Sequence, residues 1–492
     1  MQQYLLAIDQ GTTNSRAIIF NRSGLLISQH DIRLSQYFPN EGWVEQNPEE
    51  MFSNTVGCCQ EAMKKARLNA KEIAAIGISN QRETTILWDR NTSKPIYPAI
   101  VWQDRRTTEI CKQLDGKNLA GLFKSKTGLL LDPYFSATKI MWILDNIPHA
   151  RERAECGELL FGTVDTYLLW RLTGGKSHVT DASNASRTML FNITTQSWDT
   201  EILKLLNIPA CILPTVLDNA AYFGDVEANL LGGAIPITGM AGDQQAAAFG
   251  QACFQSGMVK ATYGTGCFML LNTGHHLIQS KSQLLSTVAY RLNNEITYGL
   301  EGSIFSAGVT IKWLRDTVKL IKTAAEAEEL AKSIPHTNGV YFVPAFTGLG
   351  APYWNSEARG ALLGLTQDSG KAHIARAALE CVGYQTRDLL EAMTNDNNAK
   401  FNTLRVDGGM AVNDWLLQFL SDMLNIEVQR PTCIETSALG AAYFAGLQIG
   451  MYQSLAEISN QWQMNSRFRP TMPAQKRDNL YHGWKRAIRR VL

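Results

Sequence analysis

The feature that most constrains the fold is a polar Gly/Thr turn between two short apolar segments, which occurs once in each half of the chain. Near the N-terminus the pattern covers residues 4–20, with the turn at 10–15. In the second half it covers residues 258–271, with the turn at 264–266. Apolar, β-prone runs on either side of such a turn predict a β-hairpin. Two similar halves predict a duplicated α/β fold with a cleft between two lobes.

The segments that follow each hairpin support this division. Hairpin strands followed by alternating helices and strands predict a mixed α/β sheet in each half. We place the boundary in the small-residue stretch at 245–255, which gives domains 1–250 and 251–492, and we expect the charge-rich segment after residue 465 to pack loosely. The further elements expected are strands at 25–28, 74–79 and 404–406 and helices at 49–68, 371–394 and 413–424.

Composition narrows the class of protein. The 492 residues suffice for two or three domains, and a formal net charge of +1 gives no electrostatic footprint for nucleic acid or an anionic membrane. No apolar run approaches the roughly 18–20 residues that span a bilayer, and no basic segment precedes the first apolar stretch, so neither membrane insertion nor a signal peptide is expected. The nine cysteines are scattered without a CxxC motif, which favours reduced thiols in the cytoplasm over a zinc site.

The two turns are candidate phosphate sites. Their glycines let an anion approach the backbone N–H groups, and their threonines add hydroxyl donors. A hairpin turn favours the same residues for conformational reasons, so one turn alone leaves both interpretations open. The strand-ending segment 407–409 supplies a third turn, and the three together favour a clamp on the β- and γ-phosphates of a nucleotide. The P-loop pattern GxxxxGK[ST] is absent, which excludes that type of site.

Two carboxylates follow predicted strands close to these turns. Asp9 precedes the first turn, and Asp243 follows the apolar run 237–241. Ligands of open α/β sheets bind at such strand ends, where Asp243 could accept a substrate proton while Mg²⁺ and N–H donors stabilise a transferring phosphoryl group. The alternative for Asp243 is a helix N-cap.

Several longer motifs then show a resemblance to a known family. The chain resembles the FGGY carbohydrate kinases over nearly its whole length, and within them the members that phosphorylate glycerol. The resemblance implies two duplicated ribonuclease H-like (actin-like ATPase) domains with an active-site cleft between them, the fold shared with actin, hexokinase and Hsp70. The motifs that carry it lie at residues 9–16, 80–85, 134–142, 242–245, 263–268, 346–354 and 360–380.

The resemblance also implies site residues. On the residues alone, Arg82 and Glu83 could equally form a surface charge pair, and Trp102 could be a core residue. Lys312 departs from the glutamine usual in the family, which puts its contact with the base in doubt. The implied Mg²⁺ ligands are Asp9 and Asp243, with Asp243 also the catalytic base. The implied glycerol pocket is Arg82, Glu83, Trp102, Tyr134, Asp243, Gln244 and Phe268, and the implied nucleotide contacts are Thr12, Thr13, Asn14, Arg16, Thr265, Gly308, Lys312, Gly409 and Asn413.

The implied activity is direct in-line transfer of the γ-phosphate of ATP to glycerol, the first step of glycerol utilisation, which yields sn-glycerol 3-phosphate and ADP. A homodimer or homotetramer is expected by analogy. The alternatives are a kinase of another polyol or of a pentulose and, more remotely, an actin- or Hsp70-like ATPase. Segment 231–236 is shorter than the fructose 1,6-bisphosphate loop of some bacterial relatives and lacks its arginine, so inhibition by that compound is expected to be weak or absent.

Overall fold

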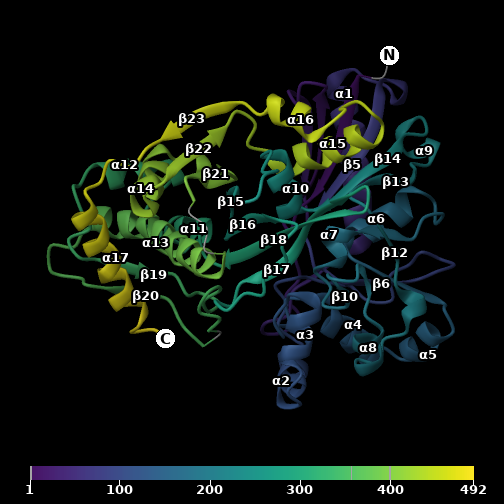
Figure 1. The fold of residues 1–492 in the computed structure, drawn as a ribbon, viewed down its shortest axis with the longest axis horizontal. Coiled ribbons are helices and arrows are strands. Elements are labelled where there is room, and N and C mark those ends of the chain that lie inside the picture. The colour runs from purple at the N-terminus through teal and green to yellow at the C-terminus, as the bar shows by residue number, and fades with distance from the viewer. Residues whose placement is uncertain (1–2, 356, 398–400) are drawn as a thin grey trace.

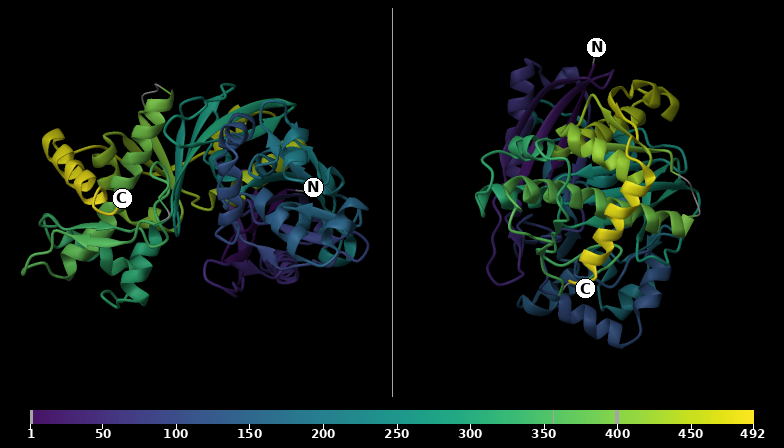
Figure 2. Two further views of the ribbon diagram at one scale, coloured as in Figure 1. Left: turned by 90° about the horizontal axis from the view of Figure 1, so that it is seen from below. Right: turned by 90° about the vertical axis from the view of Figure 1, so that its left-hand side faces the viewer.

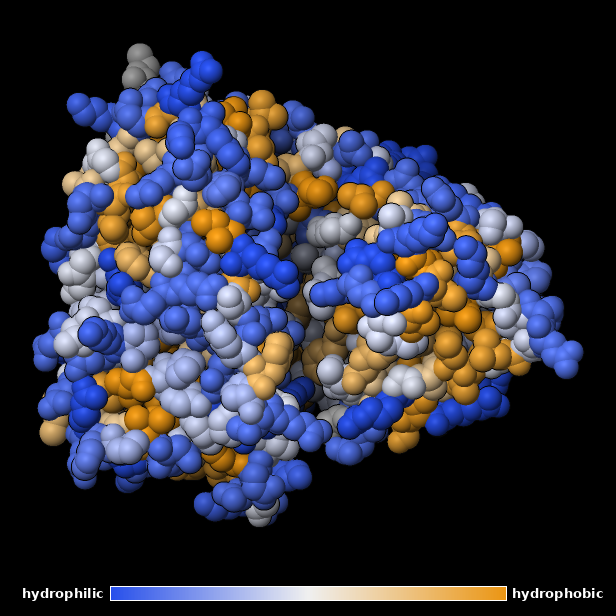
Figure 3. Space-filling model, turned by 180° about the vertical axis from the view of Figure 1, so that it is seen from behind, coloured by the Kyte–Doolittle hydropathy of each residue, from blue (hydrophilic) through white to orange (hydrophobic). Residues whose placement is uncertain are grey.

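The chain folds into two lobes, each built around one large β-sheet with helices on its faces (Figure 1). This computed structural model describes residues 3–355, 357–397 and 401–492. The N-terminus lies on one lobe and the C-terminus on the other (Figure 2), and a cleft separates the lobes in the space-filling view (Figure 3). The expected two-domain α/β architecture is therefore confirmed.

The first sheet has the strand order β13-β14-β5-β1-β2-β3. The first hairpin is present as predicted, because β1 (Tyr4–Gln10) pairs antiparallel with β2 (Asn14–Asn21), which pairs with β3 (Leu26–Arg33). The strands β5 (Ile73–Asn80) and β14 (Pro236–Gly242) run parallel to β1, so the carboxyl ends of all three meet at one edge. That edge borders the cleft.

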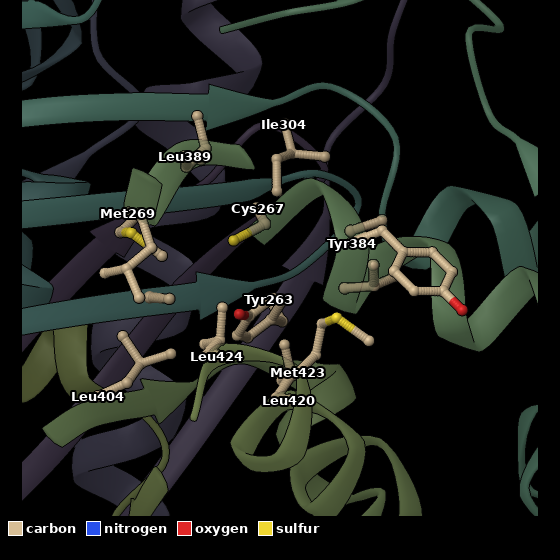
Figure 4. Close-up of a cluster of buried hydrophobic side chains, with 14 of the residues drawn as sticks. Tyr263, Cys267, Met269, Ile304, Tyr384, Leu389, Leu404, Leu420, Met423 and Leu424 are labelled. Atoms are coloured by element: carbon tan, nitrogen blue, oxygen red, sulfur yellow. The ribbon is translucent and has the colours of Figure 1, made fainter. Parts of the chain in front are cut away.

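The second sheet repeats the arrangement at the centre of the other lobe. Here β15 (Val259–Tyr263) pairs antiparallel with β16 (Cys267–Gly274) and parallel with β21 (Thr403–Asp407), as β1 pairs with β2 and β5. The helices α13 (Lys371–Asn397) and α14 (Asp414–Leu424) cover this sheet. Figure 4 shows part of the core, in which strand residues such as Tyr263, Met269 and Leu404 meet Tyr384 and Leu420 of the helices. The predicted duplication is confirmed in these strand pairings.

Two helices join the lobes. The helix α10 (Asp243–Gly250) packs closely against α15 (Thr436–Gln448), and the rings of Phe249 and Phe444 stack at 3.8 Å between centroids. Although α15 belongs to the second half of the chain, it also packs on β1, β5 and β14 of the first sheet. The division at residue 250/251 stays a prediction.

The C-terminal segment packs firmly, so the expectation of a loose tail after residue 465 was wrong. The helix α17 (Ala474–Ile488) buries Tyr481 and Trp484 completely or nearly so. The carboxylate of Asp388 accepts hydrogen bonds from Trp484 Nε1 at 2.8 Å and Lys485 Nζ at 3.0 Å. The charges of this segment occupy the faces beside an apolar stripe, which is the ordinary pattern of an amphipathic surface helix.

The remaining elements surround the two sheets. In the first lobe they are α1 (Pro48–Ala66), β4 (Glu45–Gln46), β6 (Ile86–Asp89), β7 (Ala99–Ile100), α2 (Thr108–Gly116), α3 (Ala120–Thr127), α4 (Ser136–Asn146), α5 (Ala150–Glu155), β8 (Leu159–Gly162), α6 (Val164–Leu172), β9 (Val179–Asp181), α7 (Ala182–Ala185), β10 (Phe191–Asn192), β11 (Ser197–Trp198), α8 (Thr200–Leu205), β12 (Thr215–Leu217), β13 (Ala220–Asp225) and α9 (Ala228–Leu231). Beyond it they are β17 (Leu285–Leu292), β18 (Glu295–Ile304), α11 (Gly308–Asp316), α12 (Ala324–Lys332), β19 (Tyr341–Val343), β20 (Ala361–Leu363), β22 (Glu427–Pro431), α16 (Leu455–Gln461) and β23 (Met464–Phe468).

Candidate active site

The two predicted carboxylates lie at the same edge of the first sheet. Asp9 of β1 and Ala241 of β14 are both in register with Ser79 of β5, which lies between them. Asp243 follows two residues after Ala241, at the start of α10. Because neighbouring strands are about 4.8 Å apart, the backbones of β1 and β14 are separated by about 10 Å at this edge. The pair therefore borders one site at the cleft.

The Asp243 carboxylate is oriented by Arg82 rather than used as a helix cap. Its Oδ1 atom lies 3.1 Å from Arg82 Nε and accepts the N–H of Gln244 at 2.7 Å. The N-cap position of α10 is Gly242, and no side chain caps the helix. The Asp243 side chain is 31% exposed, and its Oδ2 atom has no hydrogen-bond partner among the described residues. Oδ2 is therefore available to a ligand in the cleft.

Arg82 and Glu83 are buried, so they do not form a surface charge pair. Their side chains are each 2% exposed. Two Arg82 nitrogens contact the carboxylate of Glu301 on β18, at 2.5 and 3.1 Å, and Nη1 also donates to Gln245 Oε1 at 3.1 Å. Glu83 Oε1 accepts a hydrogen bond from Arg187 Nε at 2.7 Å. The site thus contains a buried, paired set of charges that crosses from the first lobe to the second.

Three aromatic side chains form an apolar wall beside these charges. The Trp102 ring packs edge-on against Tyr134 at 5.7 Å and against Phe268 of β16 at 6.1 Å between centroids. Trp102 Nε1 donates to Thr12 Oγ1 at 2.9 Å, which joins this wall to the first turn. Trp102 is only half-buried, so it lines the site rather than filling the core. The guanidinium carbon of Arg82 lies 5.7 Å from the ring centroid of Phe268, and this contact joins the aromatic wall to the polar residues, so the seven expected pocket residues lie together.

The first turn has one exposed residue, and its other polar side chains already have partners within the protein. Gly11 N–H donates to Asn14 O at 3.0 Å and closes the turn, while Thr13 is exposed. Asn14 Nδ2 donates to Asp31 at 3.2 Å, and Arg16 forms an ion pair with Glu435, which immediately precedes α15. The predicted contacts of Thr12, Thr13, Asn14 and Arg16 with a nucleotide stay predictions.

The second-lobe segments predicted to bind nucleotide lie against one another. The carbonyls of Gly264 and Thr265 accept N–H groups from the start of α11, each at 3.0 Å, which fixes the second turn to that helix. Lys312 lies exposed one helical turn further along α11. Gly409 begins a short 3₁₀ helix over residues 409–412, and Asn413 Oδ1 then caps α14 by accepting Leu416 N–H at 2.8 Å. The amide N–H₂ of Asn413 remains for a ligand.

Gly308 offers a test of the second turn. A Cβ atom at this position would lie 2.5 Å from Gly264 O, so alanine must displace the turn. We expect Gly308→Ala to raise the KM for ATP about tenfold or more while leaving the KM for the phosphate acceptor nearly unchanged. Gly121→Ala in α3, where nothing lies within 4 Å of the added Cβ, serves as the control. An unchanged KM for ATP in Gly308→Ala would contradict a phosphate role for this turn.

Asp9 fits a role in holding Mg²⁺. Burial raises the pKa of Asp9 to about 6, Arg16 opposes that rise, and the charges of Glu435 and Asp243 add to it. A desolvated carboxylate near two other carboxylates is relieved by a hard cation with oxygen ligands. No group of three or more His, Cys, Asp or Glu suited to a metal occurs within the described ranges. An ion between Asp9 and Asp243 would therefore take its other ligands from phosphate oxygens and water.

Sequence reasoning missed four buried polar residues of the site. They are Arg187, Gln245, Lys260 and Glu301. Lys260 Nζ donates to Gln244 Oε1 at 2.6 Å and to Thr262 Oγ1 at 2.9 Å. Burial lowers the pKa of Lys260. Lys260 and Glu301 stand inside otherwise apolar strands, and a charged residue in a buried strand is a pattern that would have indicated them.

Comparison with known proteins agrees with this fold. Residues 4–250 match the N-terminal domain of the FGGY family of carbohydrate kinases, and residues 259–449 match its C-terminal domain. The chain therefore belongs to the FGGY family of carbohydrate kinases.

Within that family the chain is similar to proteins named glycerol kinase. A glycerol kinase from Coxiella burnetii (strain Dugway 5J108-111) is 59% identical, covering 100% of this chain and 98% of the relative. Glycerol kinase 1 of Pseudomonas aeruginosa PAO1 is 57% identical, covering 100% and 99%. The crystal structure of Plasmodium falciparum glycerol kinase with ADP superposes with a TM-score of 0.92 at 36% identity, covering 99% and 98%.

A more distant solved structure shares the fold alone. Ligand-bound xylulose kinase from Lactobacillus acidophilus has a TM-score of 0.88 at 22% identity. None of the helices in the described part of the chain has the length and apolar character needed to cross a lipid bilayer.

Proposed function

We propose that this kinase transfers the γ-phosphate of ATP to a terminal hydroxyl of glycerol, giving sn-glycerol 3-phosphate and ADP. The observation that carries the proposal is the position of Asp243. Its unpartnered Oδ2 lies at the junction of a small polar and aromatic pocket with the turns that suit phosphate. Full-length identity of 57–59% to proteins named glycerol kinase supports the choice of substrate.

The chemistry of the pocket suits a small polyol. Gln244 Oε1 is held by Lys260, which leaves the Gln244 amide N–H₂ to donate to a substrate hydroxyl. Tyr134 OH is a further donor or acceptor, and the rings of Trp102 and Phe268 can cover the C–H edge of glycerol. A site that pairs buried polar groups with substrate hydroxyls rejects analogues lacking them by roughly 10⁴–10⁵.

In the proposed mechanism the attacking hydroxyl gives its proton to Asp243 Oδ2 while Arg82 holds Oδ1 in place. The N–H and hydroxyl groups of the two Gly/Thr turns hold the transferring phosphoryl group from both lobes. When bound by Asp9 and Asp243, Mg²⁺ supplies positive charge that offsets the charge developing on the phosphoryl oxygens. Closure of the lobes excludes water that would compete with the polyol.

A coupled ADP-release assay tests the proposal. The acceptors are glycerol, erythritol, xylulose, ribulose and none, each with Mg-ATP in excess. We expect turnover with glycerol to exceed turnover with every other acceptor at least about 10²-fold in kcat/KM. If turnover is faster with xylulose or ribulose, the protein is a pentulose kinase and not a glycerol kinase. If ADP is released at the same rate without any acceptor, the protein is an ATPase.

Fructose 1,6-bisphosphate is expected to have little effect. Segment 231–236 ends α9 at Leu231, turns at Gly232 and enters β14 at Pro236, and it carries no arginine or lysine for a sugar phosphate. We expect glycerol-dependent turnover to stay within about 20% when the compound is added at millimolar concentration, because anion binding at a surface loop depends on such cations. A clear, saturable drop in rate would contradict this prediction.

Cytoplasmic location and a homodimer or homotetramer are further parts of the proposal. All nine cysteines lie in the described ranges and are free, which supports a reducing compartment. Gel filtration with light scattering at several protein concentrations would measure the oligomeric state.

A further inference from the structure

We propose that Arg187 is a positioning residue that fixes the orientation of Glu83 and Arg82 toward the polyol and thereby sets the selectivity for glycerol. The inference rests on the proposed function, which supplies the polyol. Arg187 lies just after α7, far in sequence from both residues that it orients, and no motif discussed above includes it.

The guanidinium of Arg187 joins two carboxylates from different lobes. Its Nε donates to Glu83 Oε1 at 2.7 Å, and its Nη2 donates to Glu301 Oε1 at 2.9 Å. Glu301 in turn receives both Nη atoms of Arg82. Glu83, Arg187, Glu301 and Arg82 therefore form one chain of alternating charges, and all four side chains are no more than 2% exposed.

Arg187 also contacts the aromatic part of the pocket. Its guanidinium carbon lies 5.7 Å from the ring centroid of Tyr134 and 5.5 Å from that of Phe135. Its Nη1 is buried and has no hydrogen-bond partner among the described residues. An unused donor is costly in an ion pair that serves packing alone, whereas it is expected beside a space that a substrate or an ordered water fills.

The charge chain keeps the pocket groups in the form that binds hydroxyls. Without Arg187, the Glu83 carboxylate would keep only Arg82, whose Nε lies 3.9 Å away. Burial raises the pKa of Glu83, and Arg187 is the largest influence that opposes the rise. The other charged or titratable groups near Glu83 are Arg82, Glu301, Tyr134 and Lys139. A protonated or turned Glu83 could no longer accept a hydrogen bond from glycerol.

The test compares Arg187→Met and Arg187→Lys with the unmodified full-length enzyme. We expect Arg187→Met to lower kcat/KM for glycerol about 100-fold, mainly through KM, with the KM for ATP within about twofold. Arg187→Lys should recover part of that loss, because lysine restores the charge but not two directed hydrogen bonds. For Arg187→Met, the fall in kcat/KM for glycerol on lowering the pH should begin at a higher pH than in the unmodified enzyme, because Arg187 opposes the raised pKa of Glu83.

A second arm asks whether Arg187 acts through Glu83. The kcat/KM for glycerol of the double variant Glu83→Gln/Arg187→Met should lie within about threefold of that of Glu83→Gln alone. The reason is that substitutions of residues that act as one unit have non-additive effects. The matched control is Arg291→Met. Arg291 is another buried arginine, and it lies near the end of β17. Its Nε atom is 2.5 Å from Asp218 Oδ1, and among the described residues it contacts none of the pocket. It should lower the melting temperature without changing the KM for glycerol.

Each outcome decides the inference. Equal KM values for glycerol in Arg187→Met and Arg291→Met, or fully additive losses in the double variant, would overturn the role of Arg187. If Arg187→Met does not fold, Arg187→Lys takes its place in the test. Its KM for glycerol is then expected to be at least about fivefold that of the unmodified enzyme. Absence of glycerol turnover in the unmodified enzyme would instead overturn the proposed function, and the same ratios with the active acceptor of the panel would then test Arg187.

Discussion

Replacing Asp243 by asparagine is expected to lower kcat for glycerol at least about 10³-fold while ADP and ATP still bind. Asparagine keeps the size of the side chain and an oxygen for Arg82, but it cannot take the proton of the attacking hydroxyl, and general-base catalysis contributes about 10²–10⁴-fold. Removing one negative charge beside Mg²⁺ adds to the loss. Glycerol-dependent ADP release measures turnover, and titration calorimetry measures nucleotide affinity.

The matched control for this prediction is Asp225→Asn. Asp225 ends β13 on the same sheet, is exposed and accepts a hydrogen bond from Tyr222 OH at 2.8 Å outside the site. Its replacement should leave kcat within about twofold. Near-normal turnover in Asp243→Asn would remove Asp243 from the role of base, and a parallel loss of nucleotide affinity would assign it to nucleotide binding instead.

Replacing Asp9 by asparagine is expected to make the protein more stable at neutral pH and less active. The pKa of Asp9 is raised from 3.8 to about 6, chiefly by burial. Between pH 3.8 and about pH 6 the folded state binds more protons at Asp9 than the unfolded state does. The contribution of Asp9 to the free energy of unfolding is therefore fully present below pH 4 and is lost as the pH rises through about 6. About 2 pKa units at 1.36 kcal/mol each set an upper limit of about 3 kcal/mol. Asparagine should remove that cost.

Melting temperatures measured from pH 4 to pH 8 check the sign. The difference between Asp9→Asn and the unmodified protein should be small at pH 4 and should grow until about pH 7. Asp115→Asn, a change at an exposed position of α2, should show no such trend. Added Mg-ATP should raise the melting temperature of the unmodified protein more than that of Asp9→Asn, if Asp9 helps to hold the ion. A lower melting temperature of Asp9→Asn at pH 7 would contradict the argument.

Local pattern was sufficient to predict the elements that position the site. The two hairpins, the strand Ile73–Asn80 and the long helix Lys371–Asn397 follow from apolar periodicity and turn residues, which act over a few positions. The positions of Asp9 and Asp243 at strand ends follow from the same patterns. The role of each pocket residue came from the family resemblance, because no local rule distinguishes a buried Arg82 from a surface one.

The remaining part of the site depends on contacts between distant segments. Arg82 meets Glu301 across 219 positions of sequence, and Arg187 meets Glu301 across 114. Periodicity cannot reveal such partners, since it records only which face of an element is apolar. The packed C-terminal helix was missed for a related reason. Its content of charged residues suggested a solvated tail, whereas Tyr481 and Trp484 recur at a spacing of three and bury one face.

The position of α15 has a consequence for biosynthesis. Residues 436–448 cover one face of a sheet whose first strand is made from residues 4–10, and Gly440 approaches the backbone of Ala246 so closely that no side chain fits between them. The N-terminal lobe therefore cannot bury that face while the ribosome is still translating the second half. Apolar residues such as Leu5 and Phe20 stay exposed until nearly the whole polypeptide has emerged. We therefore expect this face to be prone to aggregation during translation, until α15 has been made and can cover it.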